Sequence, residues 1–376
     1  MNYHDVVEHL RRRIVNQDEA ISQIAEALAI AQAKLNEPDK PLCVLLFLGP
    51  TGVGKTETVR ALAEAIHGNV DEYCRIDMSA LSESHYAASL SGSPPGYIGS
   101  QENETMLDKK KIEGQKDRPG ILLLDEIEKA HTAVHQTLLQ IFDNARLRLA
   151  NGRTDISFNN TIIVMTSNVG SQALKTLVDR QEMGFKRLTC SRPEDEPSPE
   201  RDAHRKRVAM EALERTFRPE FLNRIDATVV FRWLDRRDMA RILDNLVGEL
   251  NTRLVEHHGV ELSLTPEAKD LLVEKGFDQK FGARQLKRAV RHLLNLPLSQ
   301  LMVSGSVARE SRIVAQRQGD SLCFEIVRGE AEITAHTSNP RRRARPPAWP
   351  IPRYGAPTMH PLPYQMPVRY VRPRFH

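Results

Sequence analysis

Apolar residues recur at three- and four-residue spacing near the start of the chain. Ile14, Ile21, Ile24 and Leu28 fall on one face of a helix that this spacing predicts over residues 5–36. Turn-forming residues follow at positions 36–39, Asn-Glu-Pro-Asp, and end the pattern. The sequence therefore predicts an N-terminal helical segment over residues 1–40.

Continuous apolar runs of strand length alternate with helical patterns in the next part. The runs span residues 43–48, 121–124 and 161–166, with a shorter candidate at 75–78. Helical patterns cover residues 57–67 and the stretch from Val134 to Phe142, and a loop rich in Ser, Gly and Pro is expected at 89–99. Alternating strands and helices indicate an α/β fold with a parallel sheet flanked by helices on both faces, here over residues 41–234.

The pattern changes twice after the last strand. Residues 186–203 are charged and contain three prolines, which favours a mobile surface insertion. From Asp235 the spacing becomes helical again, and Thr265-Pro266-Glu267 is typical of a helix start. We therefore expect a small, mainly helical domain over residues 235–330, followed by a disordered tail over residues 331–376.

Composition is ordinary for a globular protein, with 40% hydrophobic and 27% charged residues among 376. The four cysteines are far apart, which suits a reducing compartment. No secretion signal is visible at the N-terminus, and the apolar runs are too short to span a bilayer. These features predict a cytoplasmic protein that does not act at a membrane.

The basic charge is concentrated in the tail. The net charge is +4, yet the residues from Ile333 onward carry eight arginines and no acidic residue, so the remainder is acidic. Ten prolines and five scattered aromatic residues accompany these arginines from Pro340 onward. Arginine with aromatic residues can bind RNA or single-stranded DNA. The same composition suits binding to an acidic protein or a solvated tether, and we favour these two alternatives over nucleic-acid binding.

One glycine-rich segment carries strong chemical information. It satisfies the phosphate-binding pattern G-x-x-x-x-G-K-[ST] in full, between a predicted strand and a predicted helix: Gly49-Pro50-Thr51-Gly52-Val53-Gly54-Lys55-Thr56. Its glycines let backbone N–H groups approach a polyphosphate at a helix N-terminus. Lys55 would neutralise the outer phosphates of ATP, and Thr56 would ligate Mg²⁺.

Two acids complete the expected nucleotide chemistry. Asp125 and Glu126 directly follow the apolar run 121–124. An acid at the end of a buried strand can hold the water shell of a metal ion, and its neighbour can polarise an attacking water. We assign Asp125 to the metal and Glu126 to water activation.

Several ordered stretches make the chain resemble the second ATPase module of the Clp/heat-shock family of AAA+ unfoldases, over roughly residues 5–330. The matching stretches are 16–20, 46–56, 75–79, 92–99, 124–131, 166–168, 217–226 and 282–284. The resemblance implies an AAA+ ATPase fold with a small C-terminal lid. It also implies that Val15 lies in the segment beside the adenine, where Asn16 replaces the usual glycine and is expected to alter nucleotide affinity.

The resemblance implies roles for three further residues. Asn168 would be the first sensor, which orients the water near the γ-phosphate. Arg224 would be an arginine finger that reaches the nucleotide of a neighbouring subunit, and Arg284 would be the second sensor, which links nucleotide state to the small domain. A finger that acts in trans implies a ring, with a homo-hexamer as the expected form.

The resemblance also implies two contacts with other proteins. The segment Gly96-Tyr97-Ile98-Gly99 matches the pore loop of the family, whose aromatic residue grips an unfolded polypeptide. After Gly99 the sequence departs from the family pattern, and we expect this departure to affect the stiffness of the loop and its grip on substrate. The triplet Met183-Gly184-Phe185 lies where some members carry a docking segment for a Clp-type protease. Because little chain precedes residue 5, we expect a stand-alone module without the other domains of large members.

These features favour a single-ring, ATP-dependent motor that pulls or remodels polypeptides. Disaggregation, partner-specific remodelling and delivery to a protease remain open within that class. The alternatives are a nucleic-acid-associated AAA+ switch that uses the basic tail, and an ATP-binding scaffold with little turnover. An intact set of Glu126, Asn168 and Arg224 argues against the scaffold.

Overall fold

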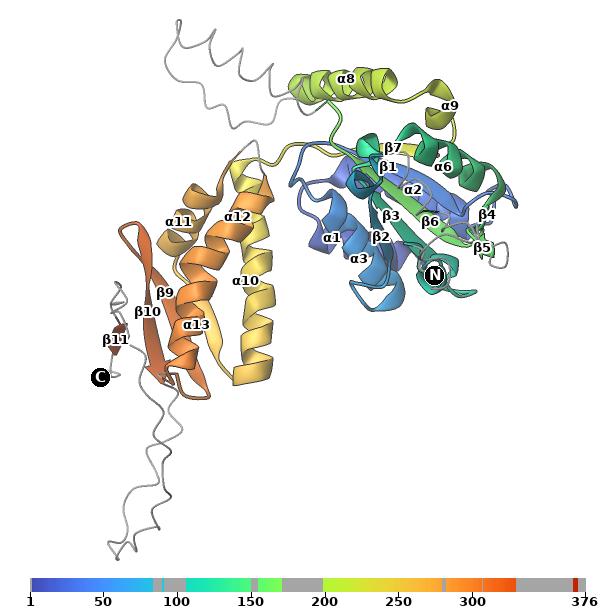
Figure 1. Ribbon diagram of the computed structural model, residues 1–376. Coiled ribbons are helices and arrows are strands. Elements are labelled where there is room, and N and C mark those ends of the chain that lie inside the picture. Colours follow the sequence, from blue (N-terminus) through green and yellow to red (C-terminus); the bar gives the residue numbers. More distant parts are fainter. Residues whose placement is uncertain are drawn as a thin grey trace, which may run out of the picture. The chain divides into compact units, whose positions relative to one another are not determined.

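The computed structural model describes residues 2–83, 90, 106–149, 155–170, 199–278, 282–305, 307–328 and 368–370 (Figure 1). They form two compact units. The first comprises residues up to Ile242 together with 276–287, and the second comprises residues 243–275 and those from Arg288 onward. No helix among the described residues has both the length and the apolar character that crossing a membrane requires.

A five-stranded, all-parallel sheet forms the centre of the first unit. Its order is β2-β3-β6-β1-β7. The strands are β1 (Cys43–Leu48), β2 (Cys74–Asp77), β3 (Gly120–Asp125), β6 (Thr161–Ser167) and β7 (Ala227–Val230). The predicted strands 43–48, 121–124 and 161–166 are confirmed and occupy the three central positions of the sheet. β7 was not predicted.

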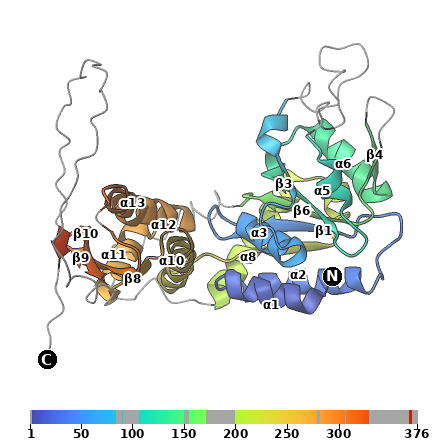
Figure 2. The same cartoon turned by 90° about the horizontal axis from the view of Figure 1, so that it is seen from below.

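Helices cover both faces of this sheet, as the alternating pattern predicted. On one face, Leu45 and Phe47 of β1 pack with α1 (Tyr3–Arg13), α2 (Asp18–Gln32) and α3 (Lys55–His67). On the other, Leu46 and Leu48 pack with residues of α5 (Lys109–Glu113), α6 (Thr132–Asn144) and α8 (Pro199–Thr216). Figure 2 shows these layers from a second direction. A parallel strand buried on both faces needs a continuous apolar run, which explains the composition of β1.

The short elements of the first unit complete the connections. They are the 3₁₀ turns η1 (Met78–Leu81) and η2 (Ile127–Lys129), the antiparallel pair β4 (Arg146–Arg148) and β5 (Asp155–Ser157), and α9 (Pro219–Leu222).

Two expectations for this unit were wrong in detail. The single helix predicted over residues 5–36 is two helices, because Ile14 is extended and Asn16 has a φ of 55°. That left-handed conformation cannot continue a helix, and asparagine tolerates it better than most residues. The insertion predicted over 186–203 overlaps α8, which begins at Pro199, while residues 186–198 lie outside the described part.

The second unit combines helices with a sheet. Most of α10 (Arg236–His258) belongs to it, with α11 (Pro266–Gly276), the π-helical segment η3 (Val290–Asn295) and α13 (Leu296–Val303). The sheet has the order β11-β10-β9-β8, from β8 (Glu261–Leu264), β9 (Ser311–Gln318), β10 (Ser321–Arg328) and β11 (Val368–Tyr370). The predicted helical character is present, but the helical pattern gave no indication of this sheet.

Candidate functional site: a phosphate-binding loop and its sensors

The three central strands end at the same edge of the sheet, and each is followed by a predicted site residue. β1 leads into the glycine-rich loop, β3 ends at Asp125, and β6 leads to Asn168. Because β3, β6 and β1 are neighbours in a parallel sheet, their carboxyl ends lie side by side. Ligands of open α/β sheets bind at this edge.

The glycines of the loop adopt backbone conformations that side chains disfavour. Gly49, Gly52 and Gly54 have φ values of 154°, 82° and 112°. A Cβ at Gly49 would lie 2.9 Å from the carbonyl oxygen of Phe231, so the loop passes tightly beside the end of β7. Gly54 immediately precedes α3, whose N-terminus offers free N–H groups to an anion.

Lys55 is buried under the loop, with 7% of its surface exposed. Its Nζ donates hydrogen bonds to the carbonyl oxygens of Gly49 (2.6 Å) and Pro50 (2.8 Å) and to Oδ1 of Asn168 (2.8 Å). Burial lowers the pKa of Lys55 from about 10.5 to about 8, although the nearby carboxylate of Glu128 opposes this shift. The ammonium group is therefore desolvated, so an ion pair with a phosphate would be stronger there than in water.

Asn168 joins the lysine to the predicted catalytic acid. While its Oδ1 accepts from Lys55, its Nδ2 donates to Oε1 of Glu126 at 3.2 Å. Its backbone N–H donates to Oε1 of Glu128 at 3.0 Å. The structure thus brings together Lys55, Glu126 and Asn168, three residues that lie on different elements and were proposed for one site.

Glu126 is held in an unusual backbone conformation, with a φ of 58°. Its N–H donates to Oγ1 of Thr166 at 3.1 Å, and the same hydroxyl donates to Oδ1 of Asp125. Non-glycine residues with positive φ are uncommon outside functional sites and turns. Thr166 therefore fixes both acids, and it is a site residue that sequence reasoning missed.

The residues that would hold Mg²⁺ fit that ion only together with a nucleotide. Asp125 supplies a carboxylate and Thr56 a hydroxyl, the oxygen ligands that Mg²⁺ prefers. Within the described ranges, no cluster of three or more His, Cys, Asp or Glu side chains could hold a metal by itself. Magnesium is usually bound by one or two carboxylates plus substrate phosphates, so this donor set suits a metal delivered with ATP.

The segment before α2 is tied to the phosphate loop by Gln17, which is 1% exposed. Its Nε2 donates to the carbonyl oxygens of Arg232 (3.0 Å) and Val53 (3.3 Å), and its Oε1 accepts from the N–H of Arg232 (3.0 Å). Val15 beside it is buried. Gln17 thus connects Val15 and Asn16 to the loop, an arrangement that only the long-range contacts show.

The stretch around Arg284 also touches the loop. The N–H of Ala283 donates to the carbonyl oxygen of Gly52 at 3.0 Å. Gly282 has a φ of 53°, and a Cβ there would lie 2.7 Å from the same oxygen, so this close approach requires glycine. Arg284 is exposed on α12 (Ala283–Ala289), and its positive charge helps to lower the pKa of Lys55. The proposed second sensor therefore lies near the phosphate loop.

Arg224 lies elsewhere. Its Nε and Nη2 donate to the two carboxylate oxygens of Asp143 on α6, at 2.7 and 3.3 Å, and this ion pair raises the pKa of the guanidinium. The side chain is 37% exposed. The pore-loop residues 96–99 and the triplet 183–185 lie outside the described residues.

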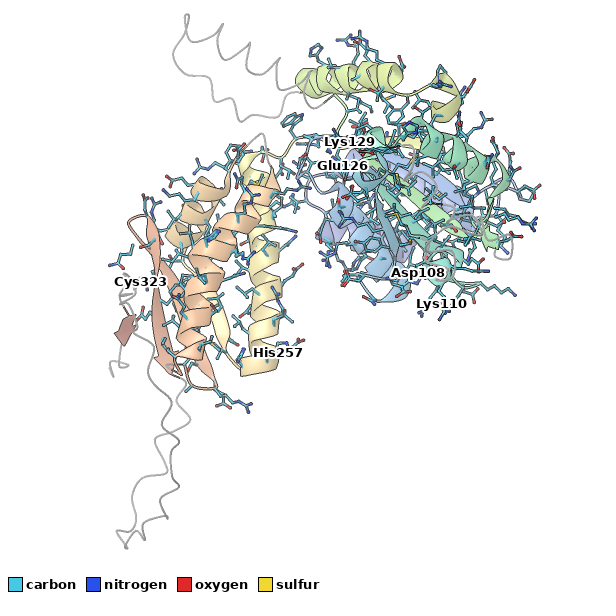
Figure 3. The ribbon with its side chains drawn as sticks, viewed as in Figure 1. Asp108, Lys110, Glu126, Lys129, His257 and Cys323 are labelled. Atoms are coloured by element: carbon cyan, nitrogen blue, oxygen red, sulfur yellow. The ribbon has the colours of Figure 1, made fainter. Side chains whose placement is uncertain are left out.

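These contacts describe a nucleoside triphosphatase of the phosphate-loop class, in which Asn168 links Lys55 to Glu126 (Figure 3 labels Glu126). The family model for an AAA domain (Cdc48 subfamily) matches residues 40–228, and that for the C-terminal, D2-small domain of ClpB protein matches residues 234–315. The chain belongs to the Clp-type AAA+ ATPases.

Relatives of two lengths are similar to the chain. An ATP-dependent protease ATP-binding subunit-like protein, AmiB, of Pseudomonas aeruginosa is 43% identical over 78% of each chain. A similarly named protein of Rhodococcus erythropolis is 41% identical over 77% of this chain and 80% of its own. The chaperone protein ClpB of Aquifex aeolicus is 40% identical over 87% of this chain, which spans only 31% of that relative.

Proposed function

We propose that this ATPase is a ring-forming motor that uses Mg²⁺-ATP to remodel or unfold polypeptides. The observation that carries the proposal is Asn168, which is hydrogen-bonded to both Lys55 and Glu126. A sensor that contacts the phosphate-binding lysine and the catalytic acid at once can respond to the γ-phosphate. The arrangement favours turnover over a scaffold that merely binds ATP.

In this proposal each residue of the site has a distinct task. The loop 49–54 would bind the phosphates through its backbone, and Lys55 would exchange its carbonyl partners for phosphate oxygens. Thr56 and Asp125 would hold Mg²⁺, which neutralises charge on the phosphates when bound. Glu126 would accept a proton from the attacking water, and Asn168, which donates to Glu126, would help to orient that water near the γ-phosphate.

The position of Arg224 supports action between subunits. Among the described residues, its side chain donates hydrogen bonds to Asp143 and to the carbonyl oxygen of Glu220, and not to the phosphate site of its own chain. An arginine of this kind adds positive charge to the transition state when it is supplied by a neighbouring copy. The proposed assembly is a homo-hexameric ring, since head-to-tail contacts close into rings.

The polypeptide substrate is proposed from the family and from Tyr97. Relatives are named as chaperones or as ATP-binding subunits of ATP-dependent proteases. Tyr97 would grip the substrate in the ring, and Met183, Gly184 and Phe185 would dock a Clp-type protease. A cytoplasmic location and the absence of a role at membranes remain predictions.

The test is ATP hydrolysis by the full chain with and without a permanently unfolded protein. We expect unfolded protein to stimulate hydrolysis, and Tyr97→Ala to abolish both stimulation and threading while basal hydrolysis stays within about twofold. Tyr97→Phe keeps the aromatic side chain and serves as the matched control. Stimulation by single-stranded nucleic acid but not by protein, lost on truncation at Asn339, would instead establish the switch that uses the basic tail.

Protease docking has its own test. Deleting residues 183–185 should abolish association with a Clp-type protease and leave stimulation by unfolded protein intact. Unchanged association would exclude this triplet as the docking segment.

A further inference from the structure

Both carboxylate oxygens of Asp125, the proposed metal ligand, are already hydrogen-bonded. Oδ1 accepts from the hydroxyl of Thr166, and Oδ2 accepts from Nη2 of Arg75 at 2.6 Å. The side chain of Asp125 is only 14% exposed, so few other partners can reach it. A metal that binds Asp125 must therefore share or displace one of these two donors.

Arg75 is the donor that can leave. Thr166 is 1% exposed on the central strand β6, and it also accepts the N–H of Glu126. Arg75 lies on the edge strand β2, and its side chain is 52% exposed. Moving this side chain costs little because water can solvate the released guanidinium, whereas moving Thr166 would disturb the backbone beside Glu126.

The placement of Arg75 follows from the register of the sheet. β2 and β3 are parallel, with Asp77 opposite Asp125 and Arg75 opposite Leu123. Arg75 thus lies two residues before the end of the sheet, and its long side chain spans that distance to reach the carboxylate. Residues 75–79 match the family pattern, yet the nucleotide chemistry described above leaves Arg75 without a role.

A purely structural role explains this contact poorly. Exposed ion pairs contribute little to stability, and an edge-strand arginine with half its surface in water is ordinarily dispensable for folding. The Arg75 guanidinium, however, carries one positive charge and is bound to the proposed metal ligand Asp125, so it competes directly with the metal for the same carboxylate. Charge-assisted hydrogen bonds of this length are among the stronger ones, so the competition is measurable.

We propose that Arg75 occupies Oδ2 of Asp125 in the nucleotide-free protein and yields it when Mg²⁺ arrives with ATP. Arg75 is then a positioning residue that sets the Mg²⁺ concentration at which nucleotide binds tightly. It also keeps Asp125 compensated while the site is empty, because a partly buried carboxylate without a partner is unfavourable. This inference rests on the proposed Mg²⁺-ATP chemistry.

The test measures nucleotide binding as a function of Mg²⁺ and requires no turnover. A fluorescent, non-hydrolysable ATP analogue is titrated onto the full chain at a series of Mg²⁺ concentrations and constant ionic strength. Arg75→Gln should lower the half-saturating Mg²⁺ concentration about three- to tenfold, the effect expected for removal of one competing ion pair. Affinity in EDTA should stay the same or fall, because positive charge is lost.

Lys110→Gln is the matched control. It removes the same charge from an exposed position on α5 in the same unit, and Figure 3 shows Lys110 well apart from Glu126. Its half-saturating Mg²⁺ concentration should equal that of the unmodified chain. Arg75→Lys keeps the charge but loses the forked donor, and it should fall between the unmodified chain and Arg75→Gln.

The outcomes separate the two proposals. If the unmodified chain shows no Mg²⁺-dependent binding, the proposed nucleotide chemistry itself fails. If it binds with Mg²⁺ but Arg75→Gln has an unchanged or raised half-saturating concentration, only the role of Arg75 is overturned. Should Arg75→Gln fail to fold, a half-saturating concentration in Arg75→Lys equal to that of the unmodified chain would overturn it as well.

Discussion

The phosphate site and the surroundings of Arg224 differ in how completely one chain builds them. At the phosphate site, Lys55 is almost fully buried and is linked through Asn168 to Glu126. Arg224 is partly exposed and donates hydrogen bonds to Asp143 and to the backbone carbonyl oxygen of Glu220. One region is preorganised in cis, and the other holds its charge at a surface.

The difference indicates how hydrolysis can be made to depend on assembly. A preorganised site can bind nucleotide within a single chain, because its donors are already placed and desolvated. In the proposed assembly, stabilisation of the transition state would then require a guanidinium that a neighbouring copy supplies. The ion pair with Asp143 would hold Arg224 in place until such a contact formed, and an exposed ion pair is weak enough to be exchanged.

The largest expected effect concerns Arg224, which we propose acts in trans. Arg224→Ala should lower ATP hydrolysis by the assembled protein about 10³-fold, because the developing phosphate charge loses its cation. Nucleotide affinity should change little, since the hydrogen bonds of Arg224 within the described part of the chain go to Asp143 and Glu220 and not to the phosphate site. Steady-state hydrolysis and equilibrium binding measure the two quantities. An equal loss of affinity would contradict the division between the regions.

Glu126→Gln tests the region that is complete in one chain. Removing the proton acceptor should lower hydrolysis about 10²- to 10³-fold and leave ATP trapped, because the amide can still accept from Asn168 but cannot take a proton. Filter binding after rapid dilution would detect the trapped nucleotide. Rapid turnover in this variant would show that another group activates the water.

The pH dependence of binding sharpens the picture of the buried lysine. Lys55 has a pKa of about 8 in the nucleotide-free protein, lowered by burial, and phosphate contact raises it again. Above pH 8 the free protein loses this proton, so binding must restore it and affinity should fall about tenfold per pH unit. Triphosphate charge is constant in this range. Affinity that is flat from pH 7.5 to 9.5 would contradict a desolvated Lys55.

The depressed pKa of Lys55 also makes the free energy of unfolding depend on pH, with a sign opposite to that of nucleotide affinity. Because the folded-state pKa of Lys55 is depressed below its unfolded value of about 10.5, the folded state binds fewer protons between these values. This lysine alone therefore makes the free energy of unfolding rise with pH across that window, even as nucleotide affinity falls.

The smallest expected effect separates backbone from side chain at Asn16. Asn16 has a φ of 55°, and its side chain is hydrogen-bonded to the carboxylate of Asp238. Asn16→Ala should lower the free energy of unfolding by about 1–2 kcal/mol, since it loses this hydrogen bond and strains the backbone. Asn16→Gly loses only the hydrogen bond and should cost less. Denaturant unfolding that ranks glycine below alanine would contradict the conformational argument.

Much of this site could be predicted from the sequence because its signals are local. The spacing of Gly49, Gly54 and Lys55 and the acids after an apolar strand each encode a turn or a strand end. The break between the first two helices could not be read from spacing, because apolar periodicity continues through residues 14–24 while the extended Ile14 and the left-handed Asn16 interrupt the helix.

The remaining site residues depend on contacts between distant segments. Arg75 and Asp125 are 50 positions apart, and Gln17 and Arg232 are 215 apart. Neither pair has a motif that joins its members, and the register of a parallel sheet alone places Arg75 within reach of Asp125. The strands of the second unit were missed because a helical pattern dominates the residues around them.

The most direct test of action in trans mixes two inactive variants. Lys55→Ala lacks a working phosphate site but keeps Arg224, and Arg224→Ala keeps the site but lacks the arginine. Equal amounts, assembled together, should recover about a quarter of the unmodified rate, because random head-to-tail pairing joins complementary halves at that frequency. Replacing Lys55→Ala by the double variant Lys55→Ala/Arg224→Ala should abolish the recovery. A mixture that stays as inactive as its components would contradict the account.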